Sequence, residues 1–216
     1  MQKAIALLSG GIDSPVAIYL LQDKLDIIPV HFHQLHLVDE SEIEKVRKLA
    51  KHLRVKRLYL APFTPVLKAL VEKCNHKHYF ILSKIAMFRA AEMIAKSSHC
   101  VRDVPNGTKE KATYLITGEN LAQVSSQTLS NLTSITKHVP IEILRPLLTY
   151  DKQEIINVAN KIGTYELSKG PEICNLLGPK RPSTKSYPEE IGRELEKLDL
   201  KVLLEECLKN AEIMEK

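Results

Sequence analysis

The sequence predicts a doubly wound α/β fold, in which helices cover both faces of a parallel sheet. Short apolar segments alternate with longer amphipathic segments along most of the chain. The short segments are almost continuously hydrophobic, as parallel strands buried on both faces are. A glycine-rich turn, Ser9–Ser14, directly follows the first of them. In doubly wound sheets, ligands bind at the carboxyl ends of strands, so this turn is a candidate ligand site.

The predicted elements follow one another in regular alternation. The segments expected to be strands are Ala4–Leu8, Ile27–His33, Arg57–Ala61, Thr113–Thr117 and Pro140–Leu144. The segments expected to be helices are Pro15–Gln22, Glu40–Leu53, one long helix across residues 65–96, Ser125–Lys137 and Asp151–Ile162. Thr149 or Asp151 is expected to cap the last of these helices, because both side chains can accept a hydrogen bond from a first-turn amide.

The positions of two prolines divide the chain into two expected parts. The stretch PSTKSYPEE, which begins at residue 182, contains two prolines, and a final amphipathic helix follows it. We therefore expect a main domain over residues 1–182 and a C-terminal helical extension over residues 183–216. Cys207 lies on the apolar face of that helix and is expected to be part of the core.

Composition indicates an ordinary globular protein rather than a membrane or disulfide-rich one. Hydrophobic residues make up 44% of the chain and charged residues 26%, and no apolar run reaches the ~20 residues of a membrane helix. The N-terminal apolar run is too short for a secretory signal, so a cytoplasmic location is expected, with no membrane partner. Four cysteines without a CxxC pair are then expected to be reduced thiols.

The net charge of +5 is concentrated in one segment. Residues 45–57 hold seven Lys or Arg and no acid. One interpretation is the solvated face of an amphipathic helix. The other is a surface that faces nucleic acid. The sequence leaves both open.

The turn SGGIDS has the features of a phosphate-binding loop. Gly10 and Gly11 allow the backbone to approach a ligand closely. Pro15 is favoured in the first turn of the following helix, where free N–H groups and the helix dipole attract an anion. The sequence lacks the GK[ST] of a Walker A loop and the spacing of GxGxxG, which excludes these two alternatives.

Polar side chains in the same turn indicate which phosphate chemistry it serves. Ser9 and Ser14 add hydroxyl donors. Asp13 would repel phosphates unless a Mg²⁺ ion bridged them, so it is the candidate metal ligand. This combination suits release of pyrophosphate from ATP better than storage of a nucleotide.

The turn resembles SGGxDS, the PP-loop signature of the ATP pyrophosphatases, which cleave ATP between the α- and β-phosphates and leave an adenylated substrate. Further segments narrow the resemblance: VHFH at 30–33, TGENLAQVSSQTLSNL at 117–132, ILRPLLTYDKQEI at 143–155, and IGTYELS at 162–168 with a cysteine soon after. Together they resemble the tRNA 4-thiouridine synthetase (ThiI) family. The resemblance implies an adenine nucleotide alpha hydrolase-like fold, with the PP-loop domain over residues 1–182.

The resemblance also implies roles for individual residues. Residues at family positions that bind ATP are Leu7, Leu8, Ser9, Gly10, Gly11, Ser14, His31, Phe32, Gly118 and Gln127. Lys84 stands where many members have an ATP-contacting arginine, which keeps the charge and loses the planar fork. Lys152 matches a catalytic lysine, whose charge would stabilise the α-phosphate and the departing pyrophosphate. Cys174 matches the cysteine that takes part in sulfur transfer, and three cations that follow it favour its thiolate.

These roles predict an enzyme that adenylates a tRNA uridine with ATP and Mg²⁺ and then replaces oxygen with sulfur. A persulfide or sulfide would be the donor. One alternative is an adenylating enzyme with a small-molecule or sulfur-carrier substrate in thiamine-related metabolism. Another is a non-catalytic subunit that binds ATP or AMP.

Departures from the family pattern shape the remaining expectations. The chain starts at the first PP-loop strand, so a separate THUMP protein is expected to present the tRNA, and no rhodanese domain is expected. Some relatives hold an iron–sulfur cluster, but here only Cys74 and Cys174 match, with His76 or His78 as substitutes. Clusters usually take three or four thiolates, so we expect none. The oligomeric state stays open, with a homodimer as one possibility.

Overall fold

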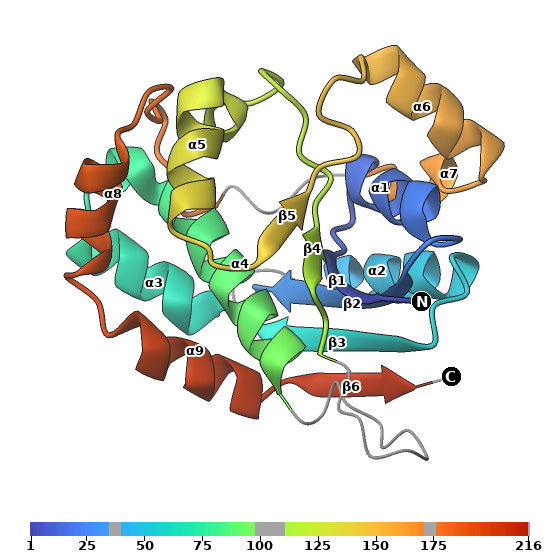
Figure 1. Cartoon of the computed structure of the whole chain (residues 1–216), viewed down its shortest axis with the longest axis horizontal. Helices are drawn as coiled ribbons and strands as arrows, with labels where there is room; N and C mark the ends of the chain where they lie inside the picture. Colours follow the sequence, from blue (N-terminus) through green and yellow to red (C-terminus); the bar gives the residue numbers. More distant parts are fainter. Residues whose placement is uncertain (35–39, 98–110, 171–175, 216) are drawn as a thin grey trace.

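A computed structural model describes residues 1–34, 40–97, 111–170 and 176–215. Its described strands are β1 Lys3–Leu7, β2 Asp26–His33, β3 Arg57–Pro62, β4 Tyr114–Ile116, β5 Glu142–Leu144 and β6 Glu212–Glu215. They form one sheet in the order β5-β4-β1-β2-β3-β6. The pairs from β5 to β3 are parallel, whereas β6 runs antiparallel to β3 at the sheet edge (Figure 1).

Helices pack on both faces of the sheet, so the predicted doubly wound arrangement is confirmed. The helices over one face are α1 Asp13–Leu21, α2 Ser41–His52 and α6 Lys152–Lys161, with the short α7 Tyr165–Ser168 beside α2 and α6. The helices over the other face are α3 Thr64–Lys73, α4 Tyr79–Lys96, α5 Leu129–Lys137, α8 Pro188–Leu195 and α9 Leu200–Lys209. Strand residues alternate between the two cores: Ile5 enters the second, and Ala4 and Ala6 enter the first.

The predicted long helix over residues 65–96 is wrong in one respect, because it is broken near its first third. α3 ends at Lys73, and Cys74 has extended backbone angles. The side chain of Asn75 then accepts a hydrogen bond from the amide of Lys77, which begins a single 3₁₀ turn, η1 His76–His78. This local bond offers the backbone an alternative to the helix, and α4 starts directly afterwards.

The helix predicted over Ser125–Lys137 also has a different start. Ser125–Gln127 form a 3₁₀ turn, η3, and α5 begins at Leu129. Thr128 separates them, because it has extended backbone angles and its side chain caps α5 by accepting a bond from the amide of Asn131.

The C-terminal segment is docked onto the second core. Leu200, Leu204 and Cys207 are buried in the core that α3 and α4 also line, so the predicted core position of Cys207 is confirmed. Burial raises the pKa of the Cys207 thiol to about 12.

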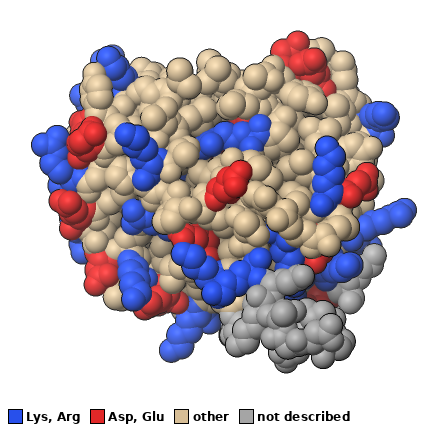
Figure 2. All heavy atoms as spheres, viewed as in Figure 1, with Lys and Arg blue, Asp and Glu red and all other residues tan. Residues whose placement is uncertain are grey.

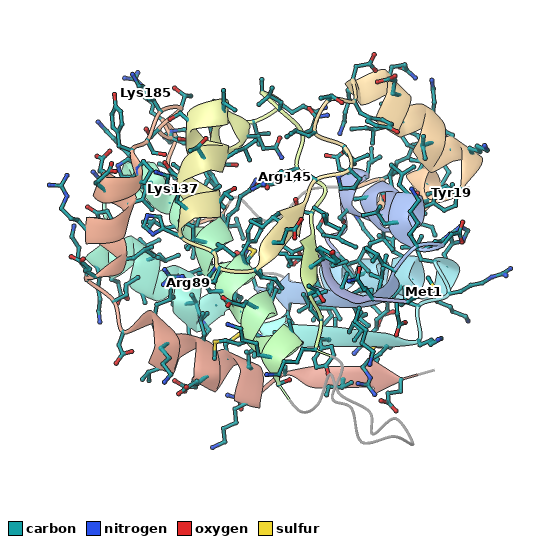
Figure 3. All side chains as sticks on the ribbon, viewed as in Figure 1. Met1, Tyr19, Arg89, Lys137, Arg145 and Lys185 are labelled. Carbon is teal, nitrogen blue, oxygen red and sulfur yellow. The ribbon has the colours of Figure 1, made fainter. Side chains whose placement is uncertain are left out.

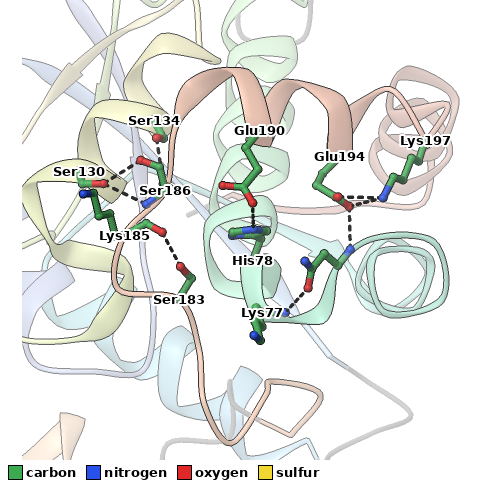
Figure 4. Close-up of polar contacts among 11 residues, drawn as sticks. Lys77, His78, Ser130, Ser134, Ser183, Lys185, Ser186, Glu190, Glu194 and Lys197 are labelled. Atoms are coloured by element: carbon green, nitrogen blue, oxygen red, sulfur yellow. Dashed lines mark hydrogen bonds and ion pairs between the residues drawn. The ribbon is translucent and has the colours of Figure 1, made fainter.

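Polar contacts hold the same segment in place (Figure 4). The amide and hydroxyl of Ser186 bond to the hydroxyls of Ser130 and Ser134 in α5, at 3.0 and 2.9 Å. Glu190 in α8 lies 3.1 Å from His78 of η1. Neither α8 nor the edge strand β6 was among the elements predicted from the sequence.

The sheet order places a switch point between β1 and β4. β1 is followed by β2 and β3 on one side, whereas β4 and β5 lie on its other side. The connections therefore diverge at the carboxyl ends of β1 and β4, where ligands of such sheets bind. Among the described residues, no helix is long and apolar enough to cross a membrane.

Candidate nucleotide site

The Ser9–Ser14 turn is closed by its own two serines. The amide of Ser9 donates to the hydroxyl of Ser14 at 2.8 Å, and the two hydroxyls lie 3.0 Å apart. The amide of Gly11 donates to the Ser9 hydroxyl at 3.2 Å. These bonds fix the curvature of the loop before the chain enters α1.

The start of α1 is open to an anion. Helix α1 starts at Asp13, two residues earlier than predicted, so Pro15 lies in its first turn rather than at its first position. The residue before it, Ile12, provides no side-chain cap, so no side chain at that position occupies the first-turn amides. Those amides and the helix dipole face the end of β1.

Gly118 allows β4 to approach this helix start. A Cβ at Gly118 would lie 2.8 Å from the amide nitrogen of Ser14 and 2.9 Å from the carbonyl carbon of Asp13. Real Cβ atoms do not come so close to backbone. The glycine is therefore needed where the turn after β4 lies against the first turn of α1, at the switch point.

At the neighbouring strand end, His31 is buried and bonded to β1. Its Nδ1 lies 2.9 Å from the carbonyl oxygen of Leu8, which fixes the ring beside the end of β1. Burial lowers its pKa to about 4, with a smaller lowering from His33 and an opposing effect of the Leu8 bond, so the ring is neutral at pH 7. Its Nε2 is buried without a hydrogen-bond partner and lies 3.9 Å from Oε1 of Glu42. Phe32, beside it, packs on Phe63 with ring centroids 4.8 Å apart.

A buried carboxylate holds two cations at the other side of the switch point. Glu119, 4% exposed, receives bonds from Lys84 of α4 at 2.8 Å and from Nε of Arg145 at 2.7 Å. Burial alone would raise the pKa of Glu119, but the two cations outweigh it and the pKa is lowered. Figure 3 places Arg145 in the middle of the molecule between α5 and β5, where Figure 2 shows basic atoms at the surface.

Lys152 lies against the glycine-rich loop. Its Nζ donates to Oδ1 of Asp13 at 2.7 Å. Asp151 caps α6 as one of the two expected residues, in a capping box with Glu154, and so fixes the helix start that carries Lys152. The other expected cap, Thr149, does not take that role. Asn120 donates to the carbonyl oxygens of Leu147 and Tyr150, which ties the turn after β4 to the segment before α6.

Gln127 ends η3. Its backbone carbonyl accepts a bond from the amide of Ala122 at 2.9 Å, so the residue closes the turn that follows β4. Its side-chain Oε1 is buried without a hydrogen-bond partner. A buried polar atom of this kind is costly unless a ligand or water satisfies it, which fits a ligand-facing position.

Cys174 lies outside the described residues. The segment leading towards it is described as far as Gly170 and contacts the phosphate loop: the hydroxyl of Ser168 donates to the carbonyl oxygen of Gly11 at 3.3 Å. The ammonium of Lys45 reaches the carbonyl oxygen of Ser168 at 3.5 Å. These hydrogen bonds hold Ser168, six residues before Cys174, beside the Ser9–Ser14 turn.

Cys74, the other cysteine considered as a cluster ligand, lies among the residues that the structure describes. Its Sγ lies 3.4 Å from the carbonyl oxygen of Glu194, and burial and Glu194 raise its pKa. His76 bonds to the carbonyl of Leu177 and His78 to Glu190. Within the described ranges, no group of three or more His, Cys, Asp or Glu side chains could hold a metal ion.

The residues present fit ATP and are compatible with one Mg²⁺ ion. The uncapped helix start, the close approach at Gly118 and the unpartnered polar atoms of His31 and Gln127 form a set that a nucleotide would complete. Mg²⁺ commonly takes one or two carboxylates and completes its shell with water and phosphate oxygens. Asp13 would supply one carboxylate, whose Oδ1 also accepts the bond from Lys152.

Sequence reasoning missed two residues of this site, Glu119 and Asn120. Both lie in the quoted segment TGENLAQ, directly after a buried strand, and both are buried polar side chains in the structure. A carboxylate and an amide at the carboxyl end of a parallel strand are the signal that could have identified them.

Sequence comparison identifies similar proteins over almost the whole chain. The family model described as "Thiamine biosynthesis protein (ThiI)" matches residues 1–200. A probable tRNA sulfurtransferase of Moorella thermoacetica is 39% identical over 98% of this chain and 53% of its own length. One from Coxiella burnetii is 38% identical, with the same two coverages. The chain spans about half the length of these curated relatives.

Solved structures agree with this. The crystal structure of a 4-thiouridine synthetase–RNA complex with bound ATP is similar with a TM-score of 0.87 and 36% identity, over 99% of this chain and 55% of that one. The NMN synthetase of Francisella tularensis is similar with a TM-score of 0.58 and 13% identity, over 95% and 84% of the two chains, which shows a shared fold.

Proposed function

The chain belongs to the ThiI family, and from this premise we propose that it adenylates a tRNA uridine with ATP and prepares that uridine for sulfur transfer. The products of the first step would be AMP-linked RNA and pyrophosphate. The observation that carries the proposal is the contact of Lys152 with Asp13 beside an uncapped helix start, because it gathers both charges of the predicted chemistry at one loop.

ATP would lie across the switch point. The adenine would meet the strand ends at Leu7, Leu8, His31 and Phe32, where His31 keeps a neutral ring against β1. The triphosphate would lie on the Ser9–Ser14 turn and on the first-turn amides of α1. Gln127, whose Oε1 has no protein partner, would bond the nucleotide from the side of η3.

The reaction itself would use fixed charges. Lys152, about half exposed, can turn its ammonium from Asp13 towards the α-phosphate, where charge grows as pyrophosphate departs. A Mg²⁺ ion on Asp13 would neutralise the β- and γ-phosphate oxygens when it is bound. Lys84 and Arg145, held by Glu119, add positive charge on the side of α4 and β5.

Sulfur transfer would follow at the same place. The Cys174 thiolate would take the outer sulfur from a persulfide donor and release the donor's thiol. That sulfur would then attack C4 of the adenylated uridine and displace AMP, and an external thiol would reduce the resulting disulfide and release 4-thiouridine. A Cβ built on Gly170, four residues before Cys174, would lie 3.1 Å from Nζ of Lys45. The segment that leads to Cys174 therefore passes close to the side chain that also contacts the phosphate loop. A THUMP domain would present the tRNA, and we propose the cytoplasm as the place of the reaction.

The test is product analysis with unmodified tRNA. The full chain is incubated with ATP, Mg²⁺, a persulfide donor, a thiol reductant and tRNA transcribed without modifications, and nucleotides and nucleosides are identified by mass spectrometry. We expect AMP and pyrophosphate that depend on tRNA, and 4-thiouridine in the recovered RNA. ADP as the product, or AMP formation that ignores RNA, would contradict the proposal.

A second candidate keeps adenylation and changes the acceptor. The matched family is described by thiamine biosynthesis, which favours a small-molecule or sulfur-carrier acceptor as the alternative. The same incubation with a sulfur-carrier peptide that ends in Gly-Gly in place of tRNA distinguishes the two. AMP release with the peptide and not with tRNA would select this candidate.

A further inference from the structure

Five exposed cations line two adjoining hollows at the amino-terminal end of the sheet. They are Lys48, Lys51, Arg54, Lys56 and Lys161, named here the amino-end basic surface. The larger hollow, of about 830 Å³, lies beside the starts of β1, β2 and β3, and Met1 and Tyr19, labelled in Figure 3, also line it. Arg54 and His52 line both hollows, so the surface is continuous.

The cations of this surface have no ion-pair partner among the described residues. Other cations of the segment 45–57 do form ion pairs: Arg47 pairs with Glu44 and Glu212, and Arg57 pairs with Glu215. The segment therefore holds paired cations near β6 and unpaired cations at the hollows. Asp23 and Asp26 are the acids that line the larger hollow, and the described residues that line the smaller one include no acid.

The surface is built on a fixed backbone. His52, at the end of α2, bonds to the carbonyl oxygen of Ile162 at the end of α6, at 2.6 Å. Gly163 has a φ of +74°, and a Cβ there would lie 3.1 Å from the His52 ring. The ends of α2 and α6 are thus held together, and Lys161 of α6 lines the larger hollow together with Arg54 and Lys56, which follow α2.

A stripe of lysines connects this surface to the nucleotide loop. Lys45, Lys48 and Lys51 are spaced by three residues on α2, so they lie along one side of the helix. Lys45 reaches the loop, because a Cβ built on Gly10 would lie 3.0 Å from its Cδ. Cationic side chains therefore extend from the Ser9–Ser14 turn to the amino-end hollows, over about 9 Å of helix axis from Lys45 to Lys51.

We propose that the amino-end basic surface binds the phosphate backbone of the RNA substrate and that α2 guides it to the nucleotide loop. The inference deepens the proposed function and rests on it for the identity of the acceptor. RNA fits better than a small anion, because five unpaired cations spread along α2, the connection after it and the end of α6 match a chain of phosphates. Contacts to phosphates would position the RNA without reading its sequence.

Two double variants test the surface. Lys48→Glu/Lys51→Glu changes α2, and Lys56→Glu/Lys161→Glu changes the larger hollow. If one double variant fails to fold, the other still tests the surface. Lys68→Glu/Lys209→Glu makes the same charge change on α3 and α9, over the opposite face of the sheet, and is the matched control. All three keep the Ser9–Ser14 turn and Lys152. Unfolding midpoints confirm that each variant is folded.

The measurement is binding of unmodified tRNA to the full chain across a salt series. Each lost phosphate contact reduces the slope of log K against log salt by about 0.7–0.9. We expect both surface variants to bind about tenfold or more weakly at about 50 mM salt, with slopes lower by about 1–2, and the control to match the wild type. Equal binding by the surface variants and the control would overturn the proposal, as would a wild-type chain that does not bind tRNA.

AMP formation separates this proposal from the proposed function. If the wild type forms AMP in a tRNA-dependent way and the surface variants do so with an unchanged KM for tRNA, the proposed RNA-binding surface is contradicted and the proposed function is supported. If AMP formation ignores tRNA while the surface variants lose RNA binding, the function is wrong and the surface stands.

Discussion

Lys152 and Asp13, the first residues of α6 and α1, form an ion pair of 2.7 Å although 139 residues separate them in the chain. The pair joins the lysine and the carboxylate that the proposed reaction needs. It also shows how the two halves of the doubly wound sheet contribute to one site, since α1 follows β1 and α6 follows β5.

We expect Lys152→Met to lower AMP formation by about 10²-fold or more, because one fixed charge at a transition state contributes that much. ATP affinity should change only a few-fold. The free energy of unfolding should fall by less than about 1 kcal/mol, since the pair is partly exposed. Single-turnover AMP release and urea unfolding measure the two effects. Lys201→Met, which removes a surface ion pair in α9, is the control and should leave both unchanged.

Asp13→Asn addresses the non-catalytic alternative. The variant keeps the shape of the side chain and removes the charge that would hold Mg²⁺, so ATP should still bind while AMP formation falls to background. Calorimetric titration of ATP and the product assay test this. A variant that turns over ATP normally would show that the carboxylate has no catalytic part, and loss of ATP binding alone would leave a sensor role open.

The local pattern of the sequence was enough for the phosphate loop and for the class of fold. SGGIDS lies between a strand and a helix, and both neighbours are contiguous in sequence, so its setting could be read directly. The pairing of Lys152 with Asp13 could not be predicted from the sequence, because the distance between α1 and α6 depends on the strand order. The two cations that hold Glu119 could not be predicted for the same reason, since they come from α4 and from the end of β5.

Elsewhere the misses have local causes. β6 has an exposed, charged sequence and is a strand because β3 offers it an edge, which no periodicity shows. The break before α4 depends on one side-chain bond of Asn75. The boundary at residue 182 and the roles of Cys174 stay predictions.

Gly118 should tolerate no side chain. Gly118→Ala would place a methyl group 2.8 Å from the backbone of Ser14, and backbone there cannot move without shifting α1. We expect a loss of about 1–3 kcal/mol in unfolding free energy, together with weaker ATP binding. Gly10→Ala is the comparison, because its new Cβ meets the flexible side chain of Lys45 at 3.0 Å. A smaller loss of stability there is the expected contrast, and equal losses would contradict it.

His31 should make stability depend on pH in the mildly acidic range. Its pKa is about 4 in the folded chain against an ordinary 6.5, so the unfolded chain binds the proton more readily between those values. The stability from neutral His31 is fully present above pH 6.5 and is lost as pH falls towards 4. At about 1.4 kcal/mol per pH unit, the loss is about 3 kcal/mol. Urea unfolding at several pH values measures it, and His31→Asn should flatten the curve over that range.

Glu119 should be more important for stability than any exposed ion pair. Glu119→Gln leaves Lys84 and Arg145 facing a neutral side chain in a nearly buried place, and an unpaired buried charge costs about 3–5 kcal/mol. Thermal and urea unfolding measure the loss. Glu166→Gln, which breaks the exposed pair with Lys169, is the control and should leave both unfolding curves unchanged.

The pH dependence of the same variant identifies the cause. The two cations hold the pKa of Glu119 below its ordinary value of 4.5, so its stabilisation is fully present above that pH and is lost as pH falls through the folded pKa. The wild type should therefore lose its advantage over Glu119→Gln below about pH 4.5, and the two unfolding curves should converge. Since His31 titrates in both proteins, their difference isolates Glu119. A difference that stays constant down to pH 3 would mean that packing of the side chain, rather than its charge, stabilises the switch point.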